Sequence, residues 1–253
     1  MNKKELICKL LKGLETGDPE SVSVVNEEKY IQHNPQTHEG SEGLAALFKR
    51  LSKTSPRVNI VRVFEDNDFV FAHTEYDFAN RNIGFEIFRF ENGQAVEHWD
   101  NIQKRKGPNA NGLSMVDGIT EIADYELTEY NRGVIKLFVE DVLIEARLEK
   151  LNGYINHEHY TEHNPNLSND LSELKRILTN SKIDASFSTS YNKCHRLLAE
   201  GNFVLSVCEG HVNNIHSSFF DLYRLENGKI VEHWDTTEAI PSRNEWKNNN
   251  GKF

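Results

Sequence analysis

The sequence YIQHNP at residues 30–35, followed by ENGQAVEHWD at 91–100, recurs later as YTEHNP at 160–165 and ENGKIVEHWD at 226–235. The first motif repeats after 130 residues and the second after 135. The difference of five residues is the size of a loop insertion between matched elements. Because a period this long exceeds that of solenoid repeats, we interpret the chain as two similar globular domains.

The length of 253 residues lets each domain bury a core of its own. We place the first domain at 1–106, a linker at 107–124 and the second domain at 125–253. The linker is rich in Gly, Asn and Pro and has little hydrophobic periodicity. The polar segment 242–253 at the end of the chain is expected to be frayed.

The chain is acidic, with 29 Lys and Arg against 39 Asp and Glu and a formal charge of −10. An acidic surface repels phosphate backbones and anionic lipid, so we expect no nucleic acid and no membrane as partners. The three cysteines have no framework spacing, which indicates a reducing compartment. No apolar run has the length of a membrane span or the pattern of a signal peptide, so we expect a soluble, cytoplasmic protein.

Each repeat is predicted to hold three helices followed by a curved, mostly antiparallel sheet, which is an α+β fold. In the first repeat, apolar residues at helical spacing predict helices at 3–14, 20–28 and 41–52. Four strands are predicted next, at 58–64, 69–78, 83–90 and 95–102. The second repeat matches these elements in order. We therefore expect two tandem cone-shaped α+β barrels.

The strands at 85–90 and 219–225 carry apolar residues on both alternating faces. A strand of this kind is usually covered on both sides. Helices cover one side, and the sheet of the sister domain is the expected cover for the other. We therefore predict an intramolecular pseudo-dimer, which leaves open whether the chain assembles further as a homo-oligomer.

Helices, then a curved sheet, with HNP after the second helix and EHWD on a late strand, resemble the SnoaL-like proteins of the nuclear-transport-factor-2-like superfamily. Within them the chain resembles the type predicted to catalyse aldol condensation, over segments 30–35, 75–78, 85–93, 97–103 and 111–118. The resemblance implies that a carboxylate removes a proton next to a carbonyl, while a histidine or another donor stabilises the enolate. It implies no metal and no cofactor. Such chemistry needs an apolar pocket and an oriented donor.

Asp100 is the first candidate for the general base, because it follows the large aromatic Trp99 on a late strand. The alternative is a strand-end Asp held by a turn or by His98. Strand alternation puts His98 and Asp100 on one face, with Glu97 and Trp99 on the other. The sequence does not say which of these faces lines the cavity.

Glu86 is the second candidate base, and it aligns with Asp221 in the second repeat. A carboxylate in an otherwise apolar strand is either buried with a partner or lines a cavity. Arg89 lies three residues further along, so alternation places it on the opposite face and excludes it as the direct partner.

Two histidines are candidate catalytic donors. His33, in the HNP motif, could donate to a substrate oxygen, or the motif could be a turn that satisfies its own backbone. His73 aligns with Val207, so a catalytic His73 would leave only the first domain active. The alternative for His73 is a surface position on an exposed strand.

The remaining candidates are aromatic and polar residues of the repeated motifs and the third helix. We expect them to bind substrate: Tyr30, Asn34, Phe48, Trp99, Tyr160, His163, Asp221, Trp234 and Asp235. No metal site is expected, because His159 and His163 would suit a metal only on a helix, and Asn164-Pro165 indicates an extended segment.

Two functions follow from these candidates. The first is a small-molecule cyclase or isomerase that acts on a carbonyl compound by cofactor-free acid–base catalysis of the aldol type. The alternative is a module that binds a small apolar ligand or a protein without turnover.

Overall fold

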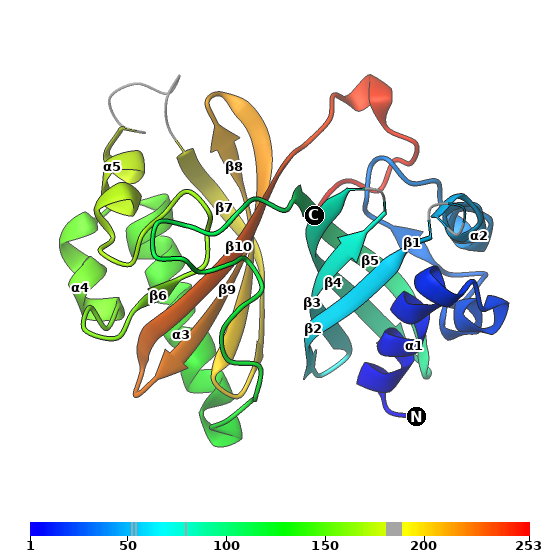
Figure 1. The fold of residues 1–253 in the computed structure, drawn as a ribbon, viewed down its shortest axis with the longest axis horizontal. Helices are drawn as coiled ribbons and strands as arrows, with labels where there is room; N and C mark the ends of the chain where they lie inside the picture. The colour runs from blue at the N-terminus through cyan, green and yellow to red at the C-terminus, as the bar shows by residue number, and fades with distance from the viewer. Residues whose placement is uncertain (52, 54, 79, 181–188) are drawn as a thin grey trace. The chain divides into compact units, whose positions relative to one another are not determined.

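The computed structural model describes residues 1–253 apart from 52, 54, 79 and 181–188 (Figure 1). The chain divides into two compact units. Unit 1 consists of Met1–Lys104 and Ile240–Phe253, and unit 2 consists of Arg105–Ala239. These ranges differ from the expected ones, because the linker is part of unit 2 and the C-terminal segment is part of unit 1. How the two units pack against each other stays a prediction.

The helices of unit 1 follow the predicted order. They are α1 (Lys3–Thr16), a 3-10 helix at Pro19–Val24 and α2 (Gly40–Leu51). Asn2 caps α1 in a reciprocal pair with Glu5, and the helix ends at Gly17, whose φ of 71° is left-handed. The predicted end of the third helix at Ser52 lies outside the described residues.

The sheet of unit 1 has five strands in the order β1-β5-β4-β3-β2. The strands are β1 (Ile31–Gln32), β2 (Arg57–Asp66), β3 (Phe69–Asp77), β4 (Arg81–Glu91) and β5 (Gln94–Lys104). β1 runs parallel to β5, and the other neighbours are antiparallel. Asn92 and Gly93 have φ angles of 51° and 84°, as the predicted hairpin turn between β4 and β5 requires. The sheet is open, so the cone is a curved sheet rather than a closed barrel.

The helices of unit 1 lie on one face of this sheet (Figure 1). Leu10 and Leu11 of α1 pack there against Val70 and Ala72 of β3 and Phe88 of β4. The opposite face is also apolar, as the alternating pattern of the strands predicted. It carries Phe71, Ile83, Phe85, Ile87 and Trp99.

Unit 2 repeats the architecture. Its helices are α3 (Thr128–Phe138), which continues as a π-helical segment at Val139–Ile144, α4 (Leu151–Tyr154) and α5 (Ser172–Asn180). Its strands are β6 (Thr161–Glu162), β7 (Thr189–Glu200), β8 (Phe203–Val212), β9 (Ile215–Glu226) and β10 (Lys229–Ala239). The order β6-β10-β9-β8-β7 matches that of unit 1 strand for strand, which confirms the duplication. In the part of the chain that the structure describes, no helix combines the length and the hydropathy of a membrane span.

The C-terminal segment 242–253 is ordered against unit 1, so the expectation that it is frayed was wrong. Asn248 donates to the backbone carbonyls of Asn34 and Thr37, and Asn250 donates to that of Gln32. Lys252 is buried. A polar segment can pack in this way because its amide side chains satisfy backbone groups around the HNP turn.

Candidate functional site

The parallel pairing of β1 with β5 begins the site in unit 1. It places Gln32 directly opposite His98. The next residue but one, Asn34, begins a turn in which its side-chain oxygen accepts from the backbone N–H of Gln36, at 2.8 Å. This turn orients the side-chain amide of Asn34, whose nitrogen donates a hydrogen bond to Asp100 at 2.7 Å. The predicted HNP turn thus serves the site through its asparagine.

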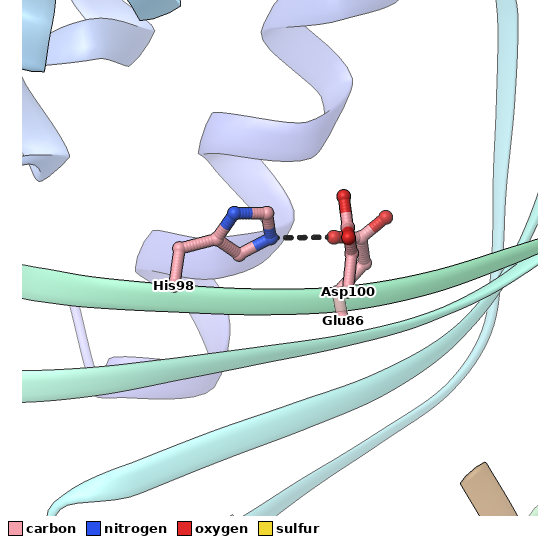
Figure 2. A group of neighbouring side chains, drawn as sticks. All are labelled: Glu86, His98 and Asp100. Carbon is pink, nitrogen blue, oxygen red and sulfur yellow. Dashed lines mark hydrogen bonds and ion pairs between the residues drawn. The ribbon is translucent and has the colours of Figure 1, made fainter. Parts of the chain in front are cut away.

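The antiparallel pairing of β4 with β5 completes the group, because it sets Glu86 opposite Asp100. His98 and Asp100 are two residues apart on β5, so they share a face of the sheet with Glu86. Figure 2 shows the three side chains rising from the same side of these two strands. All three are buried.

A chain of hydrogen bonds runs through Glu86 and His98. The Tyr76 hydroxyl donates to Oε1 of Glu86 at 2.6 Å, and Oε2 of Glu86 lies 2.6 Å from Nε2 of His98. Nδ1 of His98 lies 3.0 Å from Oε1 of Gln32, which also accepts from the backbone N–H of Asn34. Since that Gln32 atom is an acceptor, Nδ1 of His98 carries a hydrogen. A single further proton then sits between Nε2 and Oε2, on either the imidazole or the carboxyl.

Asp100 has a different set of partners. Oδ2 accepts the hydrogen bond from Asn34, and Oδ1 lies 3.4 Å from the ammonium nitrogen of Lys252. Lys252 comes from the C-terminal segment, 152 residues further along the chain. Burial gives this ion pair less screening than a surface pair would have.

Two buried tyrosines border the carboxylates. Burial raises the pKa of Tyr30 and of Tyr76 well above the usual range, and the charges of Glu86 and Asp100 add to the effect in both. Both phenols are therefore neutral donors at physiological pH. Tyr30 also stacks on the ring of His98, with 6.4 Å between centroids.

Glu86, His98 and Asp100 each offer one ligand atom to a metal ion, and these atoms lie within 4.8 Å of one another. In the structure the same groups are engaged otherwise. Glu86 and His98 bond to each other, and Asp100 faces the ammonium of Lys252. A metal ion would have to displace the shared proton and compete with Lys252.

Unit 2 contains the same constellation with one decisive substitution. Glu162 stands where unit 1 has Gln32, so His233 lies between two carboxylates. Nδ1 of His233 is 2.9 Å from Glu162 and Nε2 is 3.2 Å from Asp221. Burial alone would lower the His233 pKa, but the charge of Glu162 and the hydrogen bonds to both carboxylates raise it well above the usual value. The charged imidazolium form of His233 is therefore favoured at neutral pH.

Asp235 is the unit 2 equivalent of Asp100. Asn164 donates to both of its carboxyl oxygens at 2.8 Å, as Asn34 does to one oxygen of Asp100. Burial raises the Asp235 pKa to about 7, with further increases from the charges of Asp221 and Glu162 and an opposing effect of His233. Asp235 therefore holds a proton over much of the range in which an ordinary Asp is ionised.

The tyrosine that donates to the central carboxylate comes from different strands in the two units. In unit 1 the Tyr76 ring lies over Gly84, where a Cβ would be 2.9 Å from it. The registers place Gly210 and Phe219 at the equivalent positions of unit 2, so there the large and small residues are exchanged. Phe219 has no hydroxyl.

In unit 2 the donor to Asp221 is Tyr191 on β7, at 3.2 Å. This bond reaches Oδ1 of Asp221, the same atom that faces His233. Oδ2 of Asp221 is buried and has no hydrogen-bond partner among the described residues. One carboxyl oxygen of Asp221 therefore lacks a hydrogen-bond partner among the described residues, whereas both oxygens of Glu86 have one.

Four of the residues predicted for the first domain meet in this group: Tyr30, Asn34, Glu86 and Asp100. Three others lie on the opposite face of the sheet. His33 stacks on Trp99 at 4.6 Å between centroids, and its Nε2 lies 2.9 Å from Glu97. His73 pairs with Phe85 across the strands and stacks on its ring at 4.5 Å.

Phe48 belongs to the hydrophobic core under the helices. In unit 2, Tyr160, Asp221 and Asp235 meet in the same way, and the Tyr160 hydroxyl donates to Glu162. His163 and Trp234 stack on the opposite face at 4.8 Å between centroids, like His33 and Trp99. The histidine of each HNP motif therefore lies apart from the carboxylate group.

Sequence reasoning missed several members of the site. They are Gln32, Tyr76, His98 and Lys252 in unit 1, and Glu162, Tyr191 and His233 in unit 2. The alternation of His98 with Asp100 was a signal for the histidines. The change from Q in YIQHNP to E in YTEHNP was a signal for Gln32 and Glu162. Nothing in the composition of segment 242–253 indicated Lys252.

Comparison with known proteins identifies the first repeat. Residues 9–98 match the sequence model of the SnoaL-like domain family, so unit 1 contains a SnoaL-like domain. No curated protein matches the chain.

Solved structures similar to the chain include TsrD from Streptomyces laurentii, at 20% identity and a TM-score of 0.36. This match covers 41% of the present chain and 91% of TsrD. IdmH from Streptomyces antibioticus, described as a candidate polyketide cyclase, matches at 15% identity and a TM-score of 0.35. It covers 39% of this chain and 90% of IdmH. An epoxide hydrolase of Mycobacterium tuberculosis matches at 16% identity and a TM-score of 0.35, over 40% of this chain and 81% of that one.

Proposed function

We propose that the SnoaL-like domain of unit 1 is a cofactor-free acid–base catalyst that acts on a carbonyl compound, as a cyclase or isomerase of the aldol type. The observation that supports this most strongly is the 2.6 Å contact between Nε2 of His98 and Oε2 of Glu86. Gln32 fixes the tautomer of His98, so this contact holds one transferable proton. Asp100 lies beside it as a separate carboxylate.

The two halves of this group suit two different tasks. Asp100 removes the proton from the carbon next to the substrate carbonyl. The Glu86–His98 pair gives its proton to the carbonyl oxygen, which leaves a neutral enol instead of a charged enolate. In an isomerisation Asp100 returns its proton to another carbon, while the enol oxygen gives its proton back to the Glu86–His98 pair. In an aldol reaction the enol carbon forms a bond to a second carbonyl carbon as the enol oxygen returns its proton to the Glu86–His98 pair. The oxygen of the second carbonyl takes up the proton held by Asp100.

Unit 2 does not provide the same two tasks. Glu162 and Asp221 favour the charged form of its imidazole, His233, and burial raises the pKa of its Asp235 to about 7. A charged imidazole can donate a proton but cannot accept one, and Asp235 accepts a proton only in its ionised fraction, about half at pH 7. We therefore assign the chemistry to unit 1 and a supporting role to unit 2.

The test is exchange of α-hydrogens, because it needs no knowledge of the natural substrate. The full-length protein, dialysed against EDTA, is incubated in D2O with a panel of ketones, 1,3-diketones and β-keto esters. Loss of the α-proton signal is followed by NMR. We expect at least one class to exchange faster than in buffer, and Asp100→Asn to abolish the gain. His98→Asn or Glu86→Gln should lower it about 100-fold, the usual loss when a general acid or base is removed.

Matched variants of unit 2 provide the control. His233→Asn and Asp235→Asn change the equivalent residues and should leave the exchange rate within about twofold of wild type. If panel members bind the protein but none exchanges faster than in buffer, the unit is a binding module and the proposal is wrong. Equal losses from the variants of both units would also contradict the assignment to unit 1.

A further inference from the structure

Two segments occupy equivalent places in the two units. We call residues 107–118 the linker strap and residues 242–253 the C-terminal strap. Each follows the last strand of one sheet and is part of the other unit. The carbonyl of Gly251 lies 3.0 Å from Nδ1 of His33, and the carbonyl of Ser114 lies 2.8 Å from Nδ1 of His163. The two straps thus reach the HNP histidines of the two units through the same kind of contact.

The residue after each of these carbonyls differs in charge. In the C-terminal strap it is Lys252, which is 3% exposed and reaches Asp100. In the linker strap it is Met115, which is also 3% exposed and carries no charge. The straps therefore give a cation to unit 1 and an apolar side chain to unit 2.

This difference bears on the two matched aspartates, which otherwise share an asparagine donor and a facing carboxylate. Asp235 has Asn164 and no strap lysine, and burial raises its pKa to about 7. Asp100 has Asn34 and the ammonium of Lys252. Burying an unpaired ammonium costs several kcal/mol, so a lysine at this depth is expected where a carboxylate balances it.

We propose that Lys252 is a positioning residue that holds Asp100 in its ionised form, so that the C-terminal strap completes the site of unit 1. Its importance for catalysis rests on the proposed function, but its effect on the charge of Asp100 does not. The other titratable groups that face Asp100 are Glu86 on β4, His98 on β5, and the tyrosines Tyr30 and Tyr76. Lys252 is the cation that the strap adds to this set.

The two matched aspartates of the duplicated protein thus lie in different electrostatic surroundings. Both domains have the HNP asparagine, the facing acid and the histidine. They differ in the tyrosine donor, in the strap residue and in the Gln32-to-Glu162 exchange. Unit 1 thus combines a neutral amide partner for its imidazole with a strap lysine for its aspartate. In unit 2 the imidazole has a carboxylate partner, and the equivalent strap residue is Met115.

The experiment measures carboxyl protonation in the full-length chain by 13C NMR with carboxyl-labelled aspartate. Asp100→Asn and Asp235→Asn assign the two signals. In wild type we expect the Asp100 signal of an ionised carboxyl at pH 7. In Lys252→Met, which copies Met115, we expect the signal of a protonated carboxyl to increase at that pH. Lys252→Arg keeps a cation and should restore the wild-type signal. An unchanged Asp100 signal in Lys252→Met overturns the proposal.

Amide exchange at Lys247 and Asn250 shows whether the strap stays in place in Lys252→Met, because both amides are hydrogen-bonded within unit 1. If that variant does not fold, Met115→Lys tests the same idea in unit 2. It should lower the Asp235 pKa from about 7 by about one pH unit or more. An Asp235 that titrates as in wild type would contradict the equivalence of the straps.

The carboxyl signal and α-proton exchange separate the two proposals. If Lys252→Met protonates Asp100 and slows exchange, both hold. If it protonates Asp100 and leaves exchange unchanged, Lys252 has the electrostatic role but Asp100 is not the base. If it leaves the carboxyl ionised while exchange falls, the role given to Lys252 is wrong.

Discussion

Nδ1 of His98 lies 3.0 Å from the amide oxygen of Gln32, and at the equivalent place Nδ1 of His233 lies 2.9 Å from the carboxylate of Glu162. Both contacts arise from the same parallel pairing of a two-residue strand with the EHWD strand. An amide fixes the tautomer of the imidazole without adding charge, whereas a carboxylate stabilises the charged form. One amide-to-carboxylate difference therefore separates a proton-sharing histidine from one whose pKa is raised well above the usual value.

We expect Glu162→Gln to lower the His233 pKa by about one pH unit or more, because it removes the largest charge that opposes desolvation. The imidazole 15N shifts of His233 across a pH titration measure it. His163→Gln, which changes a histidine on the other face, is the control and should leave His233 unchanged. A His233 that titrates as before in Glu162→Gln would show that Asp221 alone keeps it charged.

This histidine also contributes to stability in a definite pH range. A pKa that is raised in the folded state stabilises the protein fully below the unfolded value of 6.5, and the contribution is lost as pH rises through the folded pKa. The difference in unfolding free energy between wild type and His233→Gln should therefore shrink on the alkaline side. Urea unfolding at a series of pH values measures it.

Much of the fold could be predicted from the sequence because the duplication supplied each element twice. Alternation in EHWD correctly placed His98 with Asp100 and Trp99 on the opposite face, since the period of a strand is two. The relation of His73 to Glu86 could not be predicted in this way. It depends on the register between β3 and β4, which sets Ala72 opposite Glu86 and so puts His73 on the other face.

The parts of the site that escaped prediction depend on contacts between distant segments. The two copies of one motif differ visibly at Gln32 and Glu162. Their contacts with the histidines, however, depend on a parallel strand register that no local sequence pattern encodes. Lys252 is harder still. The segment around it has no hydrophobic periodicity, and its partner Asp100 lies 152 residues away. The segment is held by side-chain amides that donate to backbone carbonyls, whereas its polar composition alone predicts disorder.

Asp235→Asn should make the protein less sensitive to pH. The pKa of Asp235 is about 7 in the folded state, whereas it is 3.8 in the unfolded chain. Wild-type stability is therefore reduced as pH rises from about 4 to about 7, by about 4 kcal/mol at roughly 1.4 kcal/mol for each pH unit. Asn cannot lose a proton, so the gap in unfolding free energy between variant and wild type should widen in favour of the variant. A constant gap in urea unfolding across this range would contradict the pKa.

Tyr76→Phe should cost about 1–3 kcal/mol of unfolding free energy, because it leaves Oε1 of buried Glu86 without its hydroxyl donor. The ring stays, so packing over Gly84 is kept and the loss is that of the hydrogen bond. Tyr191→Phe is the matched control in unit 2, where the bond to Asp221 is longer at 3.2 Å and should cost less. Denaturant unfolding of the two variants compares them directly, and a larger loss for Tyr191→Phe would reverse our ranking of the two carboxylates.

His33→Ala should loosen the C-terminal strap. The variant loses the contact of Nδ1 with the Gly251 carbonyl, the bond to Glu97 and the stacking on Trp99. Since Lys252 follows Gly251, its position beside Asp100 depends on this anchor. We expect faster amide hydrogen exchange across the strap, led by Lys247, whose N–H donates to the unit 1 backbone, and a stability loss of about 2 kcal/mol.

The matched variant His163→Ala removes the same three contacts in unit 2, where the imidazole binds Ser114 and Glu232 and stacks on Trp234. It should speed exchange in the linker strap and leave the C-terminal strap protected. Each histidine would then act on the strap that it touches, which distinguishes a local anchor from a general loss of stability. Equal acceleration of both straps in both variants would show instead that the HNP histidines act only through the stability of the whole fold.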